Sequence, residues 1–278
     1  MVDLITQYEK IKPAIDEAIL SVIQNAQFIN GPEVQNFQKE LEEYLEVKHV
    51  IPCANGTDAL QIALMSLDLV PGDEVITPSF TYIATTVVIA LLGLKPIFVD
   101  VDPATFCIDA TKIEAAITPK TKAVIGVHLY GQPFDIDAVK TICDKHNLFL
   151  VEDAAQAQGA RYKGKTVGVF GEMACFSFYP GKNLGALGDA GAIVTNDLKL
   201  SELLKQHRNY GSQIKYEHIV QGFNCRLDEL QAAFLRIKLS FLDQENNHRK
   251  KIAKIYNPKN LVIAFSGIEP STLMKQTS

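Results

Sequence analysis

The chain has 278 residues, of which 47% are hydrophobic and 21% are charged. These proportions are typical of globular proteins, so they exclude a disordered or collagen-like chain and allow one large domain or two smaller ones. Acidic residues outnumber basic residues by 32 to 27, and the formal net charge is −5. A mildly acidic chain without a basic run is a poor candidate for binding nucleic acids or anionic membranes.

The sequence also argues against membrane insertion and secretion. The longest apolar stretch, residues 83–94, is shorter than the ~20 residues of a membrane-spanning helix. The N-terminal segment is charged throughout, which is unlike a signal peptide. The five cysteines are scattered and odd in number, a pattern typical of reduced thiols in a cytoplasmic protein.

Two helices are predicted in the N-terminal part of the chain. The first follows the Gly31-Pro32 pair, and its apolar residues recur at helical spacing: Val34, Phe37, Leu41 and Leu45. The second follows Gly56, where apolar residues at positions 60, 63, 64 and 67 share one helical face.

Short apolar runs separate these and later helical patterns. They cover residues 74–77, 96–99, 123–127 and 148–151, and each is bounded by turn or polar residues. Runs of this length suit buried parallel strands. Strands that alternate with helices predict an α/β domain with a mostly parallel sheet between helices.

The pattern changes at Arg226, where a long amphipathic helix is predicted. Its apolar residues recur at alternating spacings of three and four: Leu227, Leu230, Phe234, Ile237 and Phe241. We therefore divide the chain into a large domain, residues 1–235, and a segment of residues 236–278 that contains most of this helix. Residues 257–278 are too few for a second folded domain.

In open α/β sheets, ligands bind at the carboxyl ends of the strands. Asp153 follows the apolar run of residues 148–151 and Glu152, and Gln156 comes three residues later. A carboxylate at this place can face a ligand or can cap a following helix, and both interpretations stay open.

A second candidate is the segment 53–57, Cys-Ala-Asn-Gly-Thr, which precedes a predicted helix. Gly56 allows close approach of the backbone, Thr57 supplies a hydroxyl, and the helix N-terminus supplies free N–H groups. Together these suit a phosphate. The alternative is an ordinary loop with a helix cap.

The third candidate is Lys182, which lies in an apolar, glycine-rich segment between residues 175 and 191. A desolvated lysine has a lowered pKa and can act as an amine nucleophile that forms a Schiff base. The alternative is a solvated lysine in a turn. No P-loop, dinucleotide fingerprint or nucleophile elbow is present, and no paired ligand spacing predicts a metal site.

Five motifs occur in an order and at a spacing that identify a family. They are Asn-Gly-Thr-Asp-Ala-Leu (55–60), Pro-Ser-Phe-Thr-Tyr (78–82), Glu-Asp-Ala-Ala-Gln-Ala-x-Gly-Ala (152–160), Ser-Phe-Tyr-Pro-x-Lys-Asn-Leu (177–184) and Gly-Asp-Ala-Gly (188–191). Over residues 1–256 the chain resembles the DegT/StrS-type sugar aminotransferases, which are pyridoxal-phosphate enzymes of fold type I. Residues 210–233 are most similar to the branch that aminates dTDP-linked 3-keto-6-deoxyhexoses.

The resemblance implies a role for each candidate residue. Lys182 would hold pyridoxal 5′-phosphate as a Schiff base and later carry the proton between substrate carbon and cofactor. Asp153 would pair with the pyridinium nitrogen and keep it protonated. Gln156 would bind the ring hydroxyl, and the phosphate would be bound by Gly56, Thr57 and Ser177. Tyr82 would stack on the ring, and Asn224 would contact the phosphate of a neighbouring subunit.

The resemblance further implies the reaction. Glutamate would donate an amino group to the cofactor, which would pass it to a nucleotide-linked keto sugar, and the active unit would be a homodimer. Relatives carry a C-terminal small domain that residues 257–278 do not resemble, so we expect that domain to be largely missing. A 4-keto-sugar aminotransferase and a truncated homologue with little or no turnover remain alternatives. In related sugar dehydratases a histidine replaces the lysine, so Lys182 favours transamination.

Overall fold

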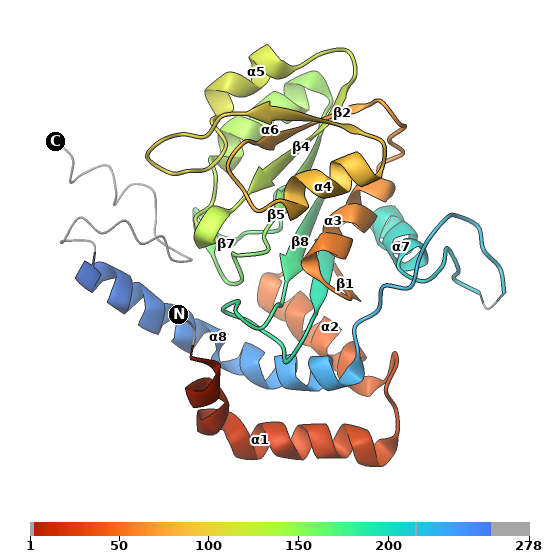
Figure 1. Cartoon of the computed structure of the whole chain (residues 1–278), viewed down its shortest axis with the longest axis vertical. Coiled ribbons are helices and arrows are strands. Elements are labelled where there is room, and N and C mark those ends of the chain that lie inside the picture. Colours follow the sequence, from red (N-terminus) through yellow and green to blue (C-terminus); the bar gives the residue numbers. More distant parts are fainter. Residues whose placement is uncertain (1–2, 215, 257–278) are drawn as a thin grey trace.

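The computed structural model describes residues 3–214 and 216–256, which form a seven-stranded sheet with helices on both faces (Figure 1). The sheet has the order β1-β9-β8-β5-β4-β2-β3. Its strands are β1 (His49–Cys53), β2 (Glu74–Pro78), β3 (Lys95–Val99), β4 (Thr121–Val127), β5 (Phe149–Asp153), β8 (Met173–Ser177) and β9 (Gly191–Thr195). A separate two-stranded ribbon consists of β6 (Arg161–Tyr162) and β7 (Lys165–Thr166).

The α-helices are α1 (Leu4–Asn25), α2 (Pro32–Leu45), α3 (Gly56–Met65), α4 (Ala84–Leu91), α5 (Ile113–Ala116), α6 (Ile136–His146), α7 (Leu198–His207) and α8 (Glu229–Tyr256). Two short 3-10 helices, η1 (Ala110–Lys112) and η2 (Leu129–Gly131), lie in the connections. Within the described ranges, no helix is long and apolar enough to cross a membrane.

The predicted mostly parallel sheet is confirmed. The pairs β2–β3, β2–β4, β4–β5 and β5–β8 are parallel, whereas β9 is antiparallel to both β8 and β1. Because β1 and β8 both oppose β9, they point the same way as the other strands of the sheet. The carboxyl ends of β1, β8, β5, β4 and β2 therefore lie along one edge.

Two hydrophobic clusters cover the two faces of the sheet. Side chains from α2, α6 and α8 pack on one face, and side chains from α3, α4 and α7 pack on the other. Successive strand residues alternate between the clusters, as with Leu150 on one face and Val151 on the other. Burial of both faces explains why the strands appear in the sequence as continuous apolar runs.

The four predicted strands are present as β2, β3, β4 and β5, with ends that differ by at most two residues. The strands β1, β8 and β9 were not among the expected elements. β1 is interrupted by Pro52 and β8 has no β-branched residue, whereas β9 has a β-branched run of only three residues, Ile193 to Thr195. They form because their side chains are buried between layers that other segments provide.

The long helix α8 is present, but its predicted apolar face is only partly correct. The residues buried along it include Ala232, Leu235, Leu239, Leu242 and Asn246, whereas Phe241 is 40% exposed. α1 and α2 pack along α8 (Figure 1), and this contact selects the buried face. α8 crosses the boundary drawn at residue 235, and the C-terminal residues 257–278 lie outside the described part of the chain.

Candidate active site

The sheet brings most of the predicted site residues to its carboxyl edge. Each follows or ends a strand whose carboxyl end lies there. Gly56 and Thr57 follow β1, Tyr82 follows β2, Asp153 ends β5 with Gln156 after it, and Ser177 ends β8 with Lys182 after it. The chain segments that carry these motifs therefore meet at one edge of the sheet, where open α/β sheets bind their ligands.

Asp153 is a buried carboxylate with two hydrogen-bond donors. It is 5% exposed. The Thr85 hydroxyl donates to Oδ2 at 2.8 Å, and the Ala155 amide donates to Oδ1 at 3.1 Å. No helix begins within residues 154–160, so Asp153 does not cap a helix. Burial raises the pKa of Asp153 above its usual value, although both hydrogen bonds and the charge of Lys182 act to lower it.

Lys182 lies in the loop of residues 178–190, which joins β8 to β9. Backbone hydrogen bonds close this loop, from Phe178 N to Ala190 O and from Ala186 N to Phe178 O, both at 2.7 Å. Burial lowers the pKa of Lys182, and the negative charge of Asp153 acts in the opposite direction. The side chain is half-buried, and burial of this kind disfavours the charged form of the amine.

The start of α3 is pressed against the end of β8. A Cβ atom at Gly56 would lie 2.6 Å from the Cβ of Ser177. The Asn55 side chain accepts a hydrogen bond from Asp58 N at 2.9 Å, and Ala59 N donates to Asn55 O. Within the described residues, the N–H groups of Gly56 and Thr57 are the donors of this first turn that have no acceptor, and they suit a phosphate.

The remaining predicted site residues are Gln156, Tyr82 and Asn224, and their contacts and exposure differ. The Oε1 atom of Gln156 accepts a hydrogen bond from Tyr130 N at 2.8 Å, which leaves its amide NH2 group to donate elsewhere. Tyr82 lies beyond β2 and is 69% exposed. Asn224 is exposed and forms an isolated β-bridge with Asn209, so its contacts do not bring it to the other site residues.

Several polar residues at the site were missed by sequence reasoning. They are the hydroxyls of Thr81 and Thr85 and the buried pair of His128 and Glu152. The only signal for the threonines is a four-residue spacing behind the end of a strand. Thr81 precedes α4 and Thr85 lies in its first turn, so the spacing does not reveal that the two hydroxyls meet each other or Asp153.

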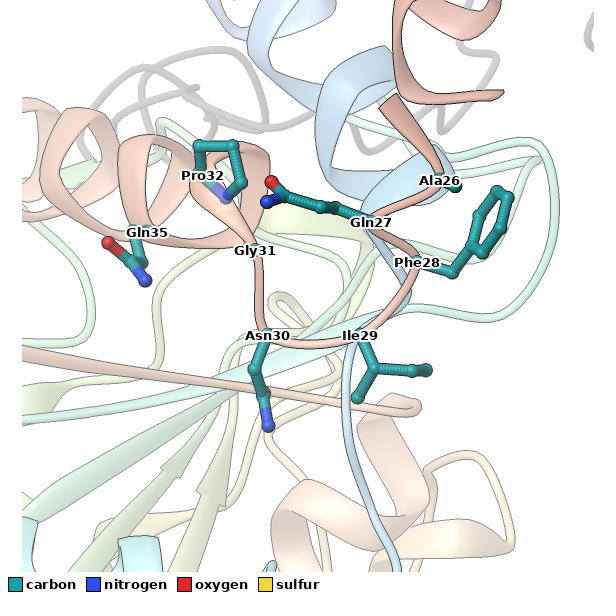
Figure 2. A pocket seen from close by; sticks show the side chains of 8 residues that line it. All are labelled: Ala26, Gln27, Phe28, Ile29, Asn30, Gly31, Pro32 and Gln35. Atoms are coloured by element: carbon teal, nitrogen blue, oxygen red, sulfur yellow. The ribbon is translucent and has the colours of Figure 1, made fainter. Parts of the chain in front are cut away.

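A separate cavity lies at the connection between α1 and α2 (Figure 2). Its volume is 690 Å³, and its lining consists of Ala26, Gln27, Phe28, Ile29, Asn30, Gly31, Pro32 and Gln35. None of these lining side chains titrates. The cavity therefore lacks the groups for acid–base or nucleophilic chemistry, and the sheet edge is the better candidate for an active site.

Two relatives are similar to this chain over most of its length. It is 47% identical to dTDP-3-amino-3,4,6-trideoxy-alpha-D-glucose transaminase of Streptomyces venezuelae, over 91% of this chain and 67% of that protein. It is 49% identical to UDP-2-acetamido-2-deoxy-3-oxo-D-glucuronate aminotransferase of Pseudomonas aeruginosa, over 92% of this chain and 71% of that protein. The chain thus spans about two thirds of the length of each relative.

Solved structures and family models agree with these similarities. The crystal structure of NtdA from Bacillus subtilis with bound cofactor PMP matches with a TM-score of 0.85 at 37% identity, over 89% of this chain and 57% of that chain. This likeness confirms the predicted α/β fold of the fold type I aminotransferases. The model of the DegT/DnrJ/EryC1/StrS aminotransferase family matches residues 9–270. The chain therefore belongs to the DegT/DnrJ/EryC1/StrS aminotransferase family, whose members include sugar aminotransferases.

Proposed function

We propose that this chain uses pyridoxal 5′-phosphate to transfer an amino group from glutamate to a nucleotide-linked 3-keto-6-deoxyhexose, with dTDP as the nucleotide. The observation that carries the proposal is that a buried carboxylate, Asp153 at the end of β5, and a half-buried amine, Lys182 in the loop after the neighbouring strand β8, lie at the same edge of the sheet and act on each other's pKa. The names of both relatives place the amino or oxo group at carbon 3, whereas their nucleotides differ. The branch resemblance of residues 210–233 favours dTDP.

The residues at the sheet edge fit this cofactor in three independent ways. The open N–H groups at the start of α3 suit its phosphate. The buried carboxylate of Asp153 suits a protonated ring nitrogen, because an ion pair compensates a charge that burial otherwise makes unfavourable. The free amide NH2 group of Gln156 suits an acceptor such as the ring hydroxyl. PMP, which the related NtdA structure contains, is the amine form of the same cofactor.

The chain's own groups supply the acid–base chemistry. When bound, the cofactor supplies an electron sink for the charge that develops on the substrate carbon. Lys182 Nζ would hold the cofactor covalently and, once released, would carry the proton between the substrate carbon and the cofactor. Asp153 keeps a proton on the ring nitrogen, and Ser177 joins Gly56 and Thr57 in binding the phosphate.

The exposed residues complete the proposal at the open side of the site. Tyr82 covers one face of the ring, and Asn224 reaches the phosphate site of a second copy of the chain, so the active unit is a homodimer. Tyr82 and Asn224 are exposed in the single chain, which is compatible with both roles. A cytoplasmic location belongs to the same proposal, and the five buried free cysteines support it.

The function is tested by separate incubation of the purified chain with dTDP-linked 3-keto- and 4-keto-6-deoxyhexoses and glutamate, with mass and NMR analysis of the products. We expect a 3-amino sugar from the 3-keto substrate. Amination of the 4-keto substrate alone would overturn the assignment of the carbon, and no amination of either substrate would contradict the proposed activity.

The lysine is tested by borohydride reduction of the chain loaded with pyridoxal phosphate, followed by peptide mapping. The adduct is expected on Lys182, and Lys182→Ala is expected to lose it. Lys199→Ala serves as the control, because Lys199 is an exposed lysine on α7. An adduct on any other lysine contradicts the role of Lys182. Asp153→Asn is expected to lower turnover by several orders of magnitude with the fold retained.

A further inference from the structure

We propose that Thr85, supported by Thr81, is a positioning residue that orients the Asp153 carboxylate and holds it in its ionised form for the ring nitrogen of the cofactor. The inference rests on the proposed function for the role of Asp153. The hydrogen bonds that carry it are properties of the chain alone.

The first step is geometric. Thr85 lies in the first turn of α4, is completely buried, and donates from Oγ1 to Asp153 Oδ2 at 2.8 Å. The Ala155 amide holds the other carboxylate oxygen, Oδ1, at 3.1 Å. Each oxygen thus has one protein donor from a different element, and two such contacts determine the rotation of the carboxylate plane.

The second step concerns protons. Thr81 Oγ1 lies 3.0 Å from Thr85 Oγ1. A hydroxyl has one proton, and Thr85 directs its proton to Asp153, so Thr81 must be the donor in the contact between the threonines. The chain of donation runs from Thr81 to Thr85 to the carboxylate. Successive hydrogen bonds of one direction strengthen one another in a buried setting, and this direction favours the ionised carboxylate.

The third step is electrostatic. Asp153 is buried among other titratable groups: Lys182 in the loop after β8, Cys175 on β8, and Glu152 and His128 at the ends of β5 and β4. Burial raises the pKa of Asp153, whereas the hydrogen bond from the Thr85 hydroxyl, the Ala155 amide and the charge of Lys182 act to lower it. A group that maintains the ionised form of Asp153 also maintains its ability to pair with a protonated ring nitrogen.

The two threonines lie in the same short segment as Tyr82, the residue proposed to stack on the ring. Thr81, Tyr82 and Thr85 lie within five consecutive residues between β2 and the first turn of α4. Tyr82 is proposed to cover the ring, and Thr85 orients the carboxylate that meets the ring nitrogen. One short segment therefore supplies both the side chain that covers the ring face and the side chain that orients the partner of the ring nitrogen.

The test compares Thr85→Val, which replaces the hydroxyl by a methyl group, with Thr85→Ser, which keeps the hydroxyl. Thr86→Val is the matched control, because Thr86 lies on the same turn and the described residues give its hydroxyl no hydrogen bond. The first measurement is an infrared pH titration of the cofactor-free full chain, with Asp153→Asn subtracted to isolate the signal of Asp153. We expect the protonated carboxyl to persist to higher pH in Thr85→Val than in the wild type, Thr85→Ser and Thr86→Val.

The second measurement is steady-state kinetics of the loaded chain. Loss of a hydrogen bond to a charged group predicts a fall in kcat of about 10- to 100-fold in Thr85→Val, with KM for the sugar changed by less than about threefold, and recovery in Thr85→Ser. In Thr81→Val, at a partly exposed position, kcat is expected to fall less than in Thr85→Val. Thr81→Val replaces Thr85→Val in the test if the latter does not fold. Identical titration and kcat in Thr85→Val and Thr86→Val would overturn the inference. If the wild type binds no pyridoxal phosphate, the proposed function fails while the titration still decides the role of Thr85.

Discussion

The Nε2 atom of His128 lies 2.9 Å from Oε2 of Glu152, and both side chains are completely buried. The Glu152 carboxylate also accepts three backbone hydrogen bonds from the loop of residues 168–171. The His128 ring stacks on Phe134 with centroids 4.7 Å apart. Because Glu152 directly precedes Asp153, this pair anchors the strand end that presents the site carboxylate.

The first prediction is that Glu152→Gln changes how stability depends on pH. Burial alone would raise the pKa of Glu152, but His128 and the backbone N–H groups outweigh it and hold the pKa below its usual value. A carboxyl with a lowered folded pKa contributes stability above its unfolded pKa, ~4.3 for glutamate, and loses that contribution as the pH falls. At pH 7, Glu152→Gln should be less stable by about 3 kcal/mol.

Urea unfolding of Glu152→Gln and the wild type at pH 7 and at pH 3, well below the unfolded pKa, checks this prediction. The difference between them should shrink on acidification. The control is Glu114→Gln, because Glu114 makes only exposed pairs with Lys145 and His146 and should change stability little. An equal difference at both pH values would show that ionisation of Glu152 is not what stabilises the fold.

The second prediction is that Asp153→Asn stabilises the cofactor-free chain. Because burial raises the pKa of Asp153, the folded chain binds this proton more tightly than the unfolded chain does. Its stabilising effect is present at low pH and is lost as the pH rises through the folded pKa. At pH 7 the ionised carboxylate therefore destabilises the folded chain. Asp153→Asn should raise the free energy of unfolding by about 1 kcal/mol.

Thermal and urea unfolding of the cofactor-free chain measure this gain, which should vanish near pH 3. Asp189→Asn is the control, since Asp189 is an exposed carboxylate close to the loop of Lys182. A loss of stability at pH 7 would mean that the hydrogen bonds of Asp153 outweigh its burial. Asp153 would then be a structural residue rather than one kept for function.

The third prediction concerns the close approach at Gly56. A Cβ atom there would lie 2.6 Å from Ser177 Cβ and 3.2 Å from Ser177 Cα, so α3 or the end of β8 must move. Gly56→Ala should cost about 1–3 kcal/mol and weaken the binding of pyridoxal phosphate at least tenfold. Gly181→Ala is the stability control, because its Cβ would meet Tyr179 at 3.6 Å. Unchanged cofactor affinity in Gly56→Ala would argue against the phosphate site.

The fourth prediction concerns Asn246, which ties α8 to the loop of Lys182. Asn246 is 3% exposed; its Nδ2 donates to Gln158 O at 3.0 Å, and its Oδ1 accepts from Asn183 Nδ2 at 2.9 Å. Asn246→Ala removes both of these bonds, while Asn183 Nδ2 still donates to Gln158 O at 2.6 Å, so the substitution should cost about 1 kcal/mol. Hydrogen exchange should become faster in residues 182–186. The control is Asn247→Ala, at the neighbouring exposed residue, which should leave the exchange rates of residues 182–186 unchanged. Unchanged exchange in Asn246→Ala would show that the loop is held by other contacts.

Local residue patterns made the parallel strands and the α2 and α3 helices predictable. The runs at β2, β3, β4 and β5 are apolar because both faces of the sheet are covered, and that requirement is visible in each segment by itself. On α8 the same reasoning identified the helix but not its full buried face. Both Phe241 and Leu242 are apolar, and only the contact with α1 and α2 decides which of them is buried.

Ordered motifs identify the family and single out Asp153 and Lys182 as candidate residues, because such motifs are properties of neighbours in the chain. Only the tertiary structure decided what meets Asp153. Thr85 reaches it across 68 positions of sequence, and His128 reaches Glu152 across 24. Such pairings depend on strand order and register, which bring distant segments to one edge of the sheet, and no local spacing encodes the partner of a buried polar group.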